Sequence, residues 1–138
     1  MVVWFLNFFY GLCMNTQNTQ HLVTRYPGLY RNGMYFECGD GWFDLIDSLS
    51  HQIEKLLVGY GSVENEETMY AIQVKEKFGT LRFYMSAYTD QMEDLMDQIE
   101  DLIEDAQSLS AKTCEVCGQP GSLNGGPWYR CVCDVHNT

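Results

Sequence analysis

Positive charge is scarce in this chain of 138 residues. Lysine and arginine together contribute 8 side chains, against 19 from aspartate and glutamate, and the formal net charge is −11 at pH 7 with histidine counted as neutral. A chain of this charge repels the phosphates of nucleic acids, so we do not expect it to bind DNA or RNA directly. The partner that this charge favours is a protein with a basic surface.

A hydrophobic run long enough to cross a membrane is also missing. The apolar segment 1–14 is shorter than the roughly 20 residues that a membrane-spanning helix needs, and it lacks flanking lysine or arginine residues. The chain shows no basic segment followed by a small-residue cleavage site, so the sequence does not predict secretion. We therefore expect a cytoplasmic protein without a membrane partner.

Residues 1–21 are apolar up to Met14 and polar from Asn15 onwards. We interpret them as an N-terminal extension, because nothing near the apolar part caps it or pairs with it. The apolar part could instead be a buried strand or a membrane-surface anchor. Translation could also begin naturally at Met14, where the composition changes.

Recognisable catalytic patterns are lacking as well. The sequence contains no nucleophile elbow and no glycine-rich loop suited to cradling a phosphate. Its paired acids are expected on a charged surface, where carboxylates keep their ordinary acidity. We therefore predict that the protein is not an enzyme.

The residues that do carry a chemical signal lie in the last quarter of the chain. Cys114-Glu115-Val116-Cys117-Gly118 places two thiols three positions apart, and Gly118 suits the positive φ that such a knuckle needs. A second cluster, Cys131-Val132-Cys133-Asp134-Val135-His136, repeats the three-residue step between Cys133 and His136. Together the clusters offer a Cys₃His set, which suits tetrahedral Zn²⁺.

Two other interpretations of these cysteines are disfavoured. Disulfides would need an oxidising compartment, and a redox Cys-x-x-Cys would be expected beside a strand–helix unit, which this glycine-rich tail lacks. Five ligand candidates compete for four positions. We predict the metal ligands Cys114, Cys117, Cys133 and His136, with Cys131 as the alternative to Cys133 or His136. Four protein ligands would leave no position for a water, so the predicted zinc ion is structural.

Apolar residues at helical spacing predict two main helices. The first follows Gly39-Asp40-Gly41, with Asp40 as its predicted N-cap, and ends at Gly59-Tyr60-Gly61. The second opens at Asp90, with Glu93 three residues later in a capping-box pattern. The predicted core positions are Trp42, Phe43, Leu45, Ile46, Leu49, Ile53, Leu56 and Leu57 on the first helix, and Met92, Leu95, Met96, Ile99, Leu102, Ile103, Ala106 and Leu109 on the second.

Between Met69 and Ala87 the apolar period changes from helical to alternating, which predicts a β-hairpin around Lys77-Phe78-Gly79. The alternating apolar side chains are Tyr70, Ile72 and Val74 on one strand, and Leu81, Phe83 and Met85 on the other. We predict a small single α+β domain with two main helices, a hairpin or small antiparallel sheet, and a C-terminal zinc knuckle. Residues 22–112 form its core and residues 113–138 its zinc-binding lobe.

The polar face of the second predicted helix is entirely acidic. No lysine or arginine lies between Asp90 and Ser110, so no i,i+4 ion pair offsets the repulsion of a few tenths of a kcal/mol per like-charged pair. Such a face is more often simply solvated, but its cost favours a role in recognition. The predicted partner-binding residues are Asp94, Asp97, Glu100, Asp101, Glu104 and Asp105.

Three segments carry a resemblance to known proteins. They are Gly39-Asp40-Gly41-Trp42-Phe43, then Gln73 to Phe83, then Thr113 to Gly121 together with Trp128 and the Cys133-x-x-His136 step. Over roughly residues 22–138 the chain resembles a family of small uncharacterised proteins of bacteriophages and prophages. This resemblance implies a bacterial host cell, and it carries no implication about activity.

In kind, small acidic phage proteins without catalytic residues are similar to anti-CRISPR inhibitors, some of which bind zinc. That similarity implies a protein that binds an RNA-guided nuclease of the host and blocks the loading of nucleic acid. The alternative is a zinc-ribbon-like module that binds nucleic acid or a transcription complex. Its candidate contact residues are Lys75, Lys77, Arg82 and Arg130.

Overall fold

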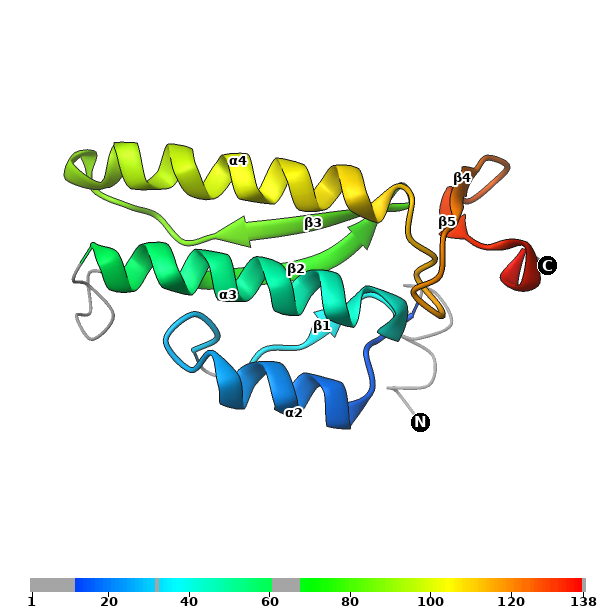
Figure 1. Ribbon diagram of the computed structural model, residues 1–138, viewed down its shortest axis with the longest axis horizontal. Helices are drawn as coiled ribbons and strands as arrows, with labels where there is room; N and C mark the ends of the chain where they lie inside the picture. Colours follow the sequence, from blue (N-terminus) through cyan, green and yellow to red (C-terminus); the bar gives the residue numbers. More distant parts are fainter. Residues whose placement is uncertain (1–11, 32, 61–67, 138) are drawn as a thin grey trace.

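The computed structural model describes residues 12–31, 33–60 and 68–137. Most of the apolar segment 1–14 therefore lies outside the described residues. Helices α3 and α4 run side by side across a small sheet, α2 packs beside α3, and the C-terminal lobe lies at one end (Figure 1). The structure confirms the predicted α+β class.

The element order shows both main helices and the hairpin. The helices are α2 (Thr16–Arg25), α3 (Phe43–Gly59) and α4 (Glu93–Ser110), with short 3₁₀ turns η1 (Asp40–Trp42), η2 (Asp90–Met92) and η3 (Asp134–His136). The strands are β1 (Phe36–Glu37), β2 (Ala71–Lys77), β3 (Thr80–Met85), β4 (Ser122–Asn124) and β5 (Arg130–Val132). In the main sheet β1 runs parallel to β2, and β2 pairs antiparallel with β3, while β4 and β5 form a separate antiparallel pair.

The stretch that we interpreted as a polar extension forms helix α2 from Thr16 onwards. Asn15 caps this helix, because its side-chain oxygen accepts a hydrogen bond from the backbone N–H of Asn18 at 2.7 Å. Leu22 is fully buried in the core. The helix spans the boundary that we predicted at residue 21. Residues 16–21 of the predicted extension therefore belong to the folded domain.

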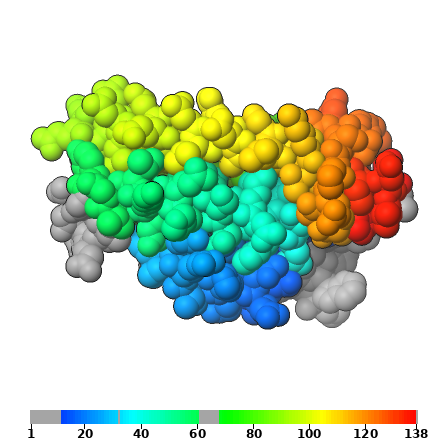
Figure 2. All heavy atoms as spheres, viewed as in Figure 1, coloured from blue at the N-terminus to red at the C-terminus, as the bar shows by residue number. Residues whose placement is uncertain are grey.

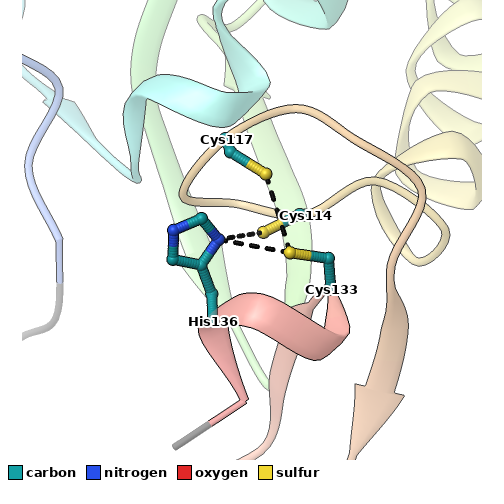
Figure 3. A group of neighbouring side chains, drawn as sticks. All are labelled: Cys114, Cys117, Cys133 and His136. Carbon is teal, nitrogen blue, oxygen red and sulfur yellow. Dashed lines mark hydrogen bonds between the residues drawn. The ribbon is translucent and has the colours of Figure 1, made fainter.

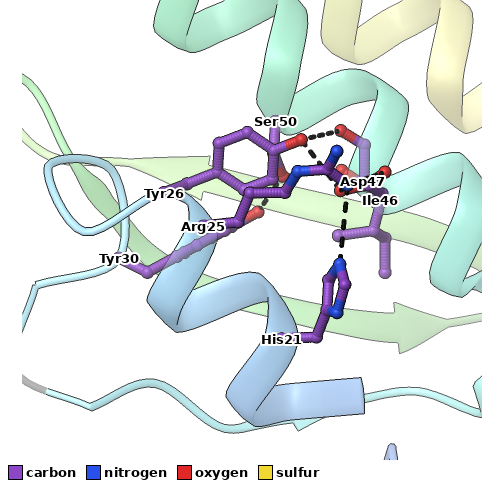
Figure 4. Close-up of polar contacts among 7 residues, drawn as sticks. All are labelled: His21, Arg25, Tyr26, Tyr30, Ile46, Asp47 and Ser50. Atoms are coloured by element: carbon purple, nitrogen blue, oxygen red, sulfur yellow. Dashed lines mark hydrogen bonds and ion pairs between the residues drawn. The ribbon is translucent and has the colours of Figure 1, made fainter.

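Polar contacts fix α2 and the following turn against α3 (Figure 4). Arg25 pairs with Asp47 at 3.2 Å, and the Tyr26 hydroxyl donates to the Asp47 carboxylate at 2.8 Å. The buried Tyr30 hydroxyl shares a hydrogen bond with Ser50. Burial and the bond to Asp47 raise the pKa of Tyr26 to about 12, so its hydroxyl stays protonated as a donor.

The predicted helix caps are wrong at both main helices. The residues at the cap positions are Trp42 and Met92, and neither makes a side-chain cap hydrogen bond. Each helix instead continues from a 3₁₀ turn, which occupies the residues that we expected to cap it. The Asp40 carboxylate accepts from the Asn15 N–H at 2.9 Å, and it therefore joins the start of α2 to the start of α3.

Candidate metal centre

Four side chains from two short turns converge in the C-terminal lobe. Cys114 and Cys117 lie on the turn that follows α4, while Cys133 precedes η3 and His136 ends it. Their ligand atoms all lie within 4.8 Å of one another. Figure 3 shows the three sulfurs and the imidazole pointing toward a common centre. This group could hold a metal ion.

The individual separations are short. The sulfurs of Cys117 and Cys133 are 3.7 Å apart. Nδ1 of His136 lies 3.2 Å from the Cys133 sulfur and 3.6 Å from the Cys114 sulfur. Nδ1 is therefore the imidazole atom that faces the centre.

The backbone of each turn aims its two ligands at the same point. In the first turn the N–H of Gly118 donates to the carbonyl of Cys114 at 2.9 Å, and the φ of Gly118 is +78°. The positive φ predicted for Gly118 is confirmed, and it reverses the chain directly after Cys117. In the second turn the N–H of His136 donates to the carbonyl of Cys133 at 3.1 Å.

Cys131 does not belong to this group. It lies on β5, is completely buried and packs within the hydrophobic core. Burial raises the pKa of its thiol, which favours the neutral form in that apolar setting. Of the five candidates, the structure thus brings together the four that we predicted and places Cys131 in the core.

The thiols at the centre differ in acidity. Burial alone would raise the pKa of Cys114, but the backbone N–H groups of Cys133, Cys117 and Val116 act on its sulfur and lower that pKa to about 6. For exposed Cys117 the N–H of Gln119 lowers the pKa, but desolvation and the neighbouring thiols outweigh it and the pKa is raised. The lowered pKa favours the thiolate form of Cys114, which is the form that binds metals.

The first cysteine turn packs directly against the start of α3. The N–H of Gly41 donates to the Glu115 carbonyl at 2.7 Å, and the N–H of Gly39 donates to the Glu115 carboxylate at 2.9 Å. The indole N–H of buried Trp42 donates to the carbonyl of Thr113 at 2.9 Å. The centre is thus joined to the core by hydrogen bonds from three residues of one segment.

Two of these residues must be glycine for a steric reason. A Cβ atom on Gly41 would lie 2.2 Å from the carbonyl oxygen of Cys114, and one on Gly39 would lie 2.3 Å from that of Glu115. Both contacts are with backbone atoms, which cannot move aside as a flexible side chain could. Sequence reasoning placed this segment only as a helix start and missed its role as the seat of the metal turn.

Glu115 is the buried acid at this junction. Burial raises the pKa of its carboxyl group to about 7, and the hydrogen bond from Gly39 acts in the opposite direction. Its backbone also joins the first cysteine turn to strand β5, because its N–H donates to the carbonyl of Cys131 at 2.9 Å. Glu115, the first of the two residues between Cys114 and Cys117, therefore belongs to the framework of the site.

The predicted partner-binding acids lie on α4 and are not among the residues of the metal centre. All six are exposed on α4, and none of their side chains forms a hydrogen bond or an ion pair within the part of the chain that the structure describes. They are Asp94, Asp97, Glu100, Asp101, Glu104 and Asp105. The predicted acidic surface is therefore present and solvent-facing.

No family model, curated protein or solved structure matches the chain. Among the described segments, none of the helices combines the length and the apolar character that crossing a bilayer requires.

Proposed function

We propose that the Cys₃His group binds one Zn²⁺ ion. Zinc–sulfur bonds of about 2.3 Å and zinc–nitrogen bonds of about 2.0 Å in a tetrahedron give S···S separations of about 3.8 Å and S···N separations of about 3.5 Å. One S···S distance, 3.7 Å, and two S···N distances, 3.2 and 3.6 Å, lie close to these values, and all the ligand atoms lie within 4.8 Å of one another. Three thiolates and one imidazole are also the ligands that zinc prefers.

In this proposal the zinc ion is structural. Four protein ligands complete its coordination, so a water would have no position at which the ion could activate it. The ion would instead hold together two turns that share little apolar core of their own. Cys131 and Val132 are the buried side chains of the adjoining strand β5.

The protein itself we propose to be a non-enzymatic inhibitor that binds a basic surface of another protein. The observation that carries this proposal is the uncompensated acidic face of α4. Acids in the first turn, Glu93 and Asp94, are favoured by the helix dipole, but Glu104 and Asp105 lie in the second half of the helix, where no such benefit exists. Their repulsion is a cost to the free protein that a basic partner would relieve.

The similarity in kind to anti-CRISPR proteins suggests the class of partner. An RNA-guided nuclease holds nucleic acid in a positively charged channel. An acidic helix in that channel would compete with the phosphates for the same lysine and arginine side chains. We therefore propose such a nuclease of the bacterial host as the target, with loading of nucleic acid as the step that is blocked.

Neutralising the acidic face should abolish capture of the partner. In the test variant the six acids are changed to their amides, Asp→Asn and Glu→Gln, which leaves the apolar stripe of α4 intact. We expect an RNA-guided nuclease to be retained from a bacterial lysate by the native protein, and at least about tenfold less of it by the variant. Capture should also fall with added salt, because exposed charges are screened over about 8 Å at physiological ionic strength.

Quantitative mass spectrometry of the retained proteins makes this measurement, and circular dichroism confirms that the variant is folded. Equal capture by both proteins would show that the acidic face is not the binding surface. Retention of basic proteins without any nuclease among them would keep the binding function and reject the proposed target.

Binding of nucleic acid is the second candidate function, and the structure contains an observation that favours it. Lys75 lies directly across from Arg82 in the hairpin, and the Lys77 ammonium lies 5.6 Å from the ring centroid of Phe78. The hairpin turn meets the C-terminal lobe, since a Cβ on Gly79 would lie 3.3 Å from the Arg130 backbone. The four cations that we singled out thus occur near one end of the sheet.

An aromatic side chain accompanies these cations. Phe78 is 65% exposed and has a φ of 55°, which a residue other than glycine rarely adopts. Exposed rings beside cations can stack on the bases of a single strand. Binding of oligothymidine at physiological salt, lost in a Lys77→Ala/Arg130→Ala variant, would favour this function, whereas we expect no binding because of the net charge of −11.

A further inference from the structure

A groove follows the line where α3 and α4 meet. It consists of two hollows of about 290 and 790 Å³, which share the lining residues Gln52 and Leu102. The first reaches the cysteine turn at Gly118, and the second reaches Tyr60 beyond the end of α3. On the face shown in Figure 2 the surfaces of the two helices run side by side between these ends.

The groove has an apolar floor, in which Leu49 and Leu95 are buried and the other leucines are partly or largely exposed. Leucines from both helices line it, and they are Leu45, Leu49 and Leu56 from α3 and Leu95, Leu102 and Leu109 from α4. Its two ends carry large exposed side chains. Leu109, which we predicted in the core, is 57% exposed, and Tyr60 is 47% exposed. The accessible part of this floor is carried by Leu45, Leu56, Leu102 and Leu109.

The rim of the groove is acidic. Asp94, Asp101 and Asp105 of α4 and Asp44 of α3 line it, whereas Lys55 is the one cation among its described lining residues. The spacing of the three α4 acids is seven and then four residues, which keeps them on one side of a helix. The groove therefore combines apolar and negative surface.

The other three of the six predicted acids form a second stripe that turns away from this groove. Glu100 and Glu104 border a different hollow, between α4 and the end of β3. Asp97 lies three and seven residues before them and lines neither groove hollow. The acidic face that the sequence presents as one surface thus has two sides. Both border apolar side chains, but the groove between the helices is lined by four acids and the hollow beside β3 by two.

We propose that the α3–α4 groove binds one amphipathic basic helix of the partner protein, an inference that rests on the proposed binding function and specifies its site. The apolar stripe of such a helix would lie on the leucine floor, and its lysine or arginine side chains would reach the carboxylates of the rim. α3 has 17 residues and α4 has 18, so a groove between them accommodates a helix of about 25 Å.

The test uses a synthetic peptide of leucine and lysine at helical spacing, equal in length to the 18 residues of α4. A peptide of the same composition in strict alternation, which favours a strand, is the control probe. Isothermal titration calorimetry with the metal-loaded protein measures both affinities. We expect the helical peptide to bind at least about tenfold more tightly than the alternating one.

Two matched variants then separate the groove from the rest of the acidic face. D94N/D101N/D105N removes three charges from the rim, and D97N/E100Q/E104Q removes three from the other stripe of the same helix. We expect the rim variant to weaken peptide binding about tenfold and the outer variant no more than about threefold. Leu109→Ser, at a side chain that is already 57% exposed, should weaken binding without unfolding the protein.

Other results of these experiments would reject either the groove alone or the groove together with the proposed function. Equal losses in the two triple variants, or equal binding of the two peptides, would leave the acidic face as a binding surface and reject the groove as its site. No loss in either variant would reject the groove and the proposed function together.

Discussion

Replacing Cys117 by serine should release the metal and unfold the C-terminal lobe. The side chain of Cys117 is exposed, so the substitution removes a ligand without opening a cavity. Binding of structural zinc supplies on the order of 10 kcal/mol to folding in small zinc domains at neutral pH, and this contribution depends on a complete ligand set. Elemental analysis should find one zinc ion per native chain and less than about a tenth of that in the variant.

Cys131→Ala is the control for this substitution. Cys131 lies two positions from the ligand Cys133, but it packs in the core and not at the metal centre. We expect this variant to keep one zinc ion per chain and to lose about 1 kcal/mol of stability from the small cavity. Full metal content in Cys117→Ser, or loss of metal from Cys131→Ala, would show that the ligand set is wrong.

Gly41→Ala should destabilise the protein strongly while leaving its metal in place. The added methyl group would lie 2.2 Å from the Cys114 carbonyl oxygen, so the cysteine turn must move away from α3. That movement breaks the 2.7 Å hydrogen bond from Gly41 to Glu115. Overpacking together with this loss should cost about 3 kcal/mol, or about 10 °C in the midpoint of thermal unfolding.

The same glycine-to-alanine change at Gly59, at the other end of α3, should have the opposite effect on stability. Gly59 ends α3, and an added Cβ would meet no atom within 4 Å. Alanine should therefore raise stability by up to about 1 kcal/mol, because it favours the helix more than glycine does. Calorimetry on both metal-loaded variants makes the comparison. Equal stability of the two would mean that the metal turn does not rest on the start of α3.

Elements defined by local spacing could be predicted from the sequence. The apolar residues of α3 and α4 recur at helical period over about four turns each, which is long enough to be distinctive. The step of three residues within Cys114–Cys117 and Cys133–His136 limits the ligand choices in the same way. Each of these signals is contained within a few neighbouring positions of the chain.

Features that depend on distant parts of the chain could not be predicted in this way. Ile72 was expected to lie on the same apolar side of β2 as Val74. A β-bulge between Ala71 and Gln73 instead shifts the register and leaves Ile72 56% exposed. Gly41 is required by a carbonyl oxygen that is 73 residues away, at Cys114. A single sequence contains no signal for either effect.

The acidic face of α4 also depends on a distant part of the chain. Helical spacing alone places Asp94, Asp101 and Asp105 apart from Asp97, Glu100 and Glu104, but it does not say which stripe borders another helix. Only the position of α3 beside α4 turns the first stripe into the rim of a groove. The packing of the two helices thus identifies the acids to test first.

X-ray absorption spectroscopy of the metal-loaded protein tests the central claim most directly, namely that the metal centre is closed and structural. The spectrum should show zinc with three sulfur neighbours at about 2.3 Å and one nitrogen neighbour at about 2.0 Å. Such a shell has no position for an activated water. A shell with an oxygen neighbour in place of one sulfur or of the nitrogen would reveal an open site, and it would contradict both the ligand set and the proposal that the protein is not an enzyme.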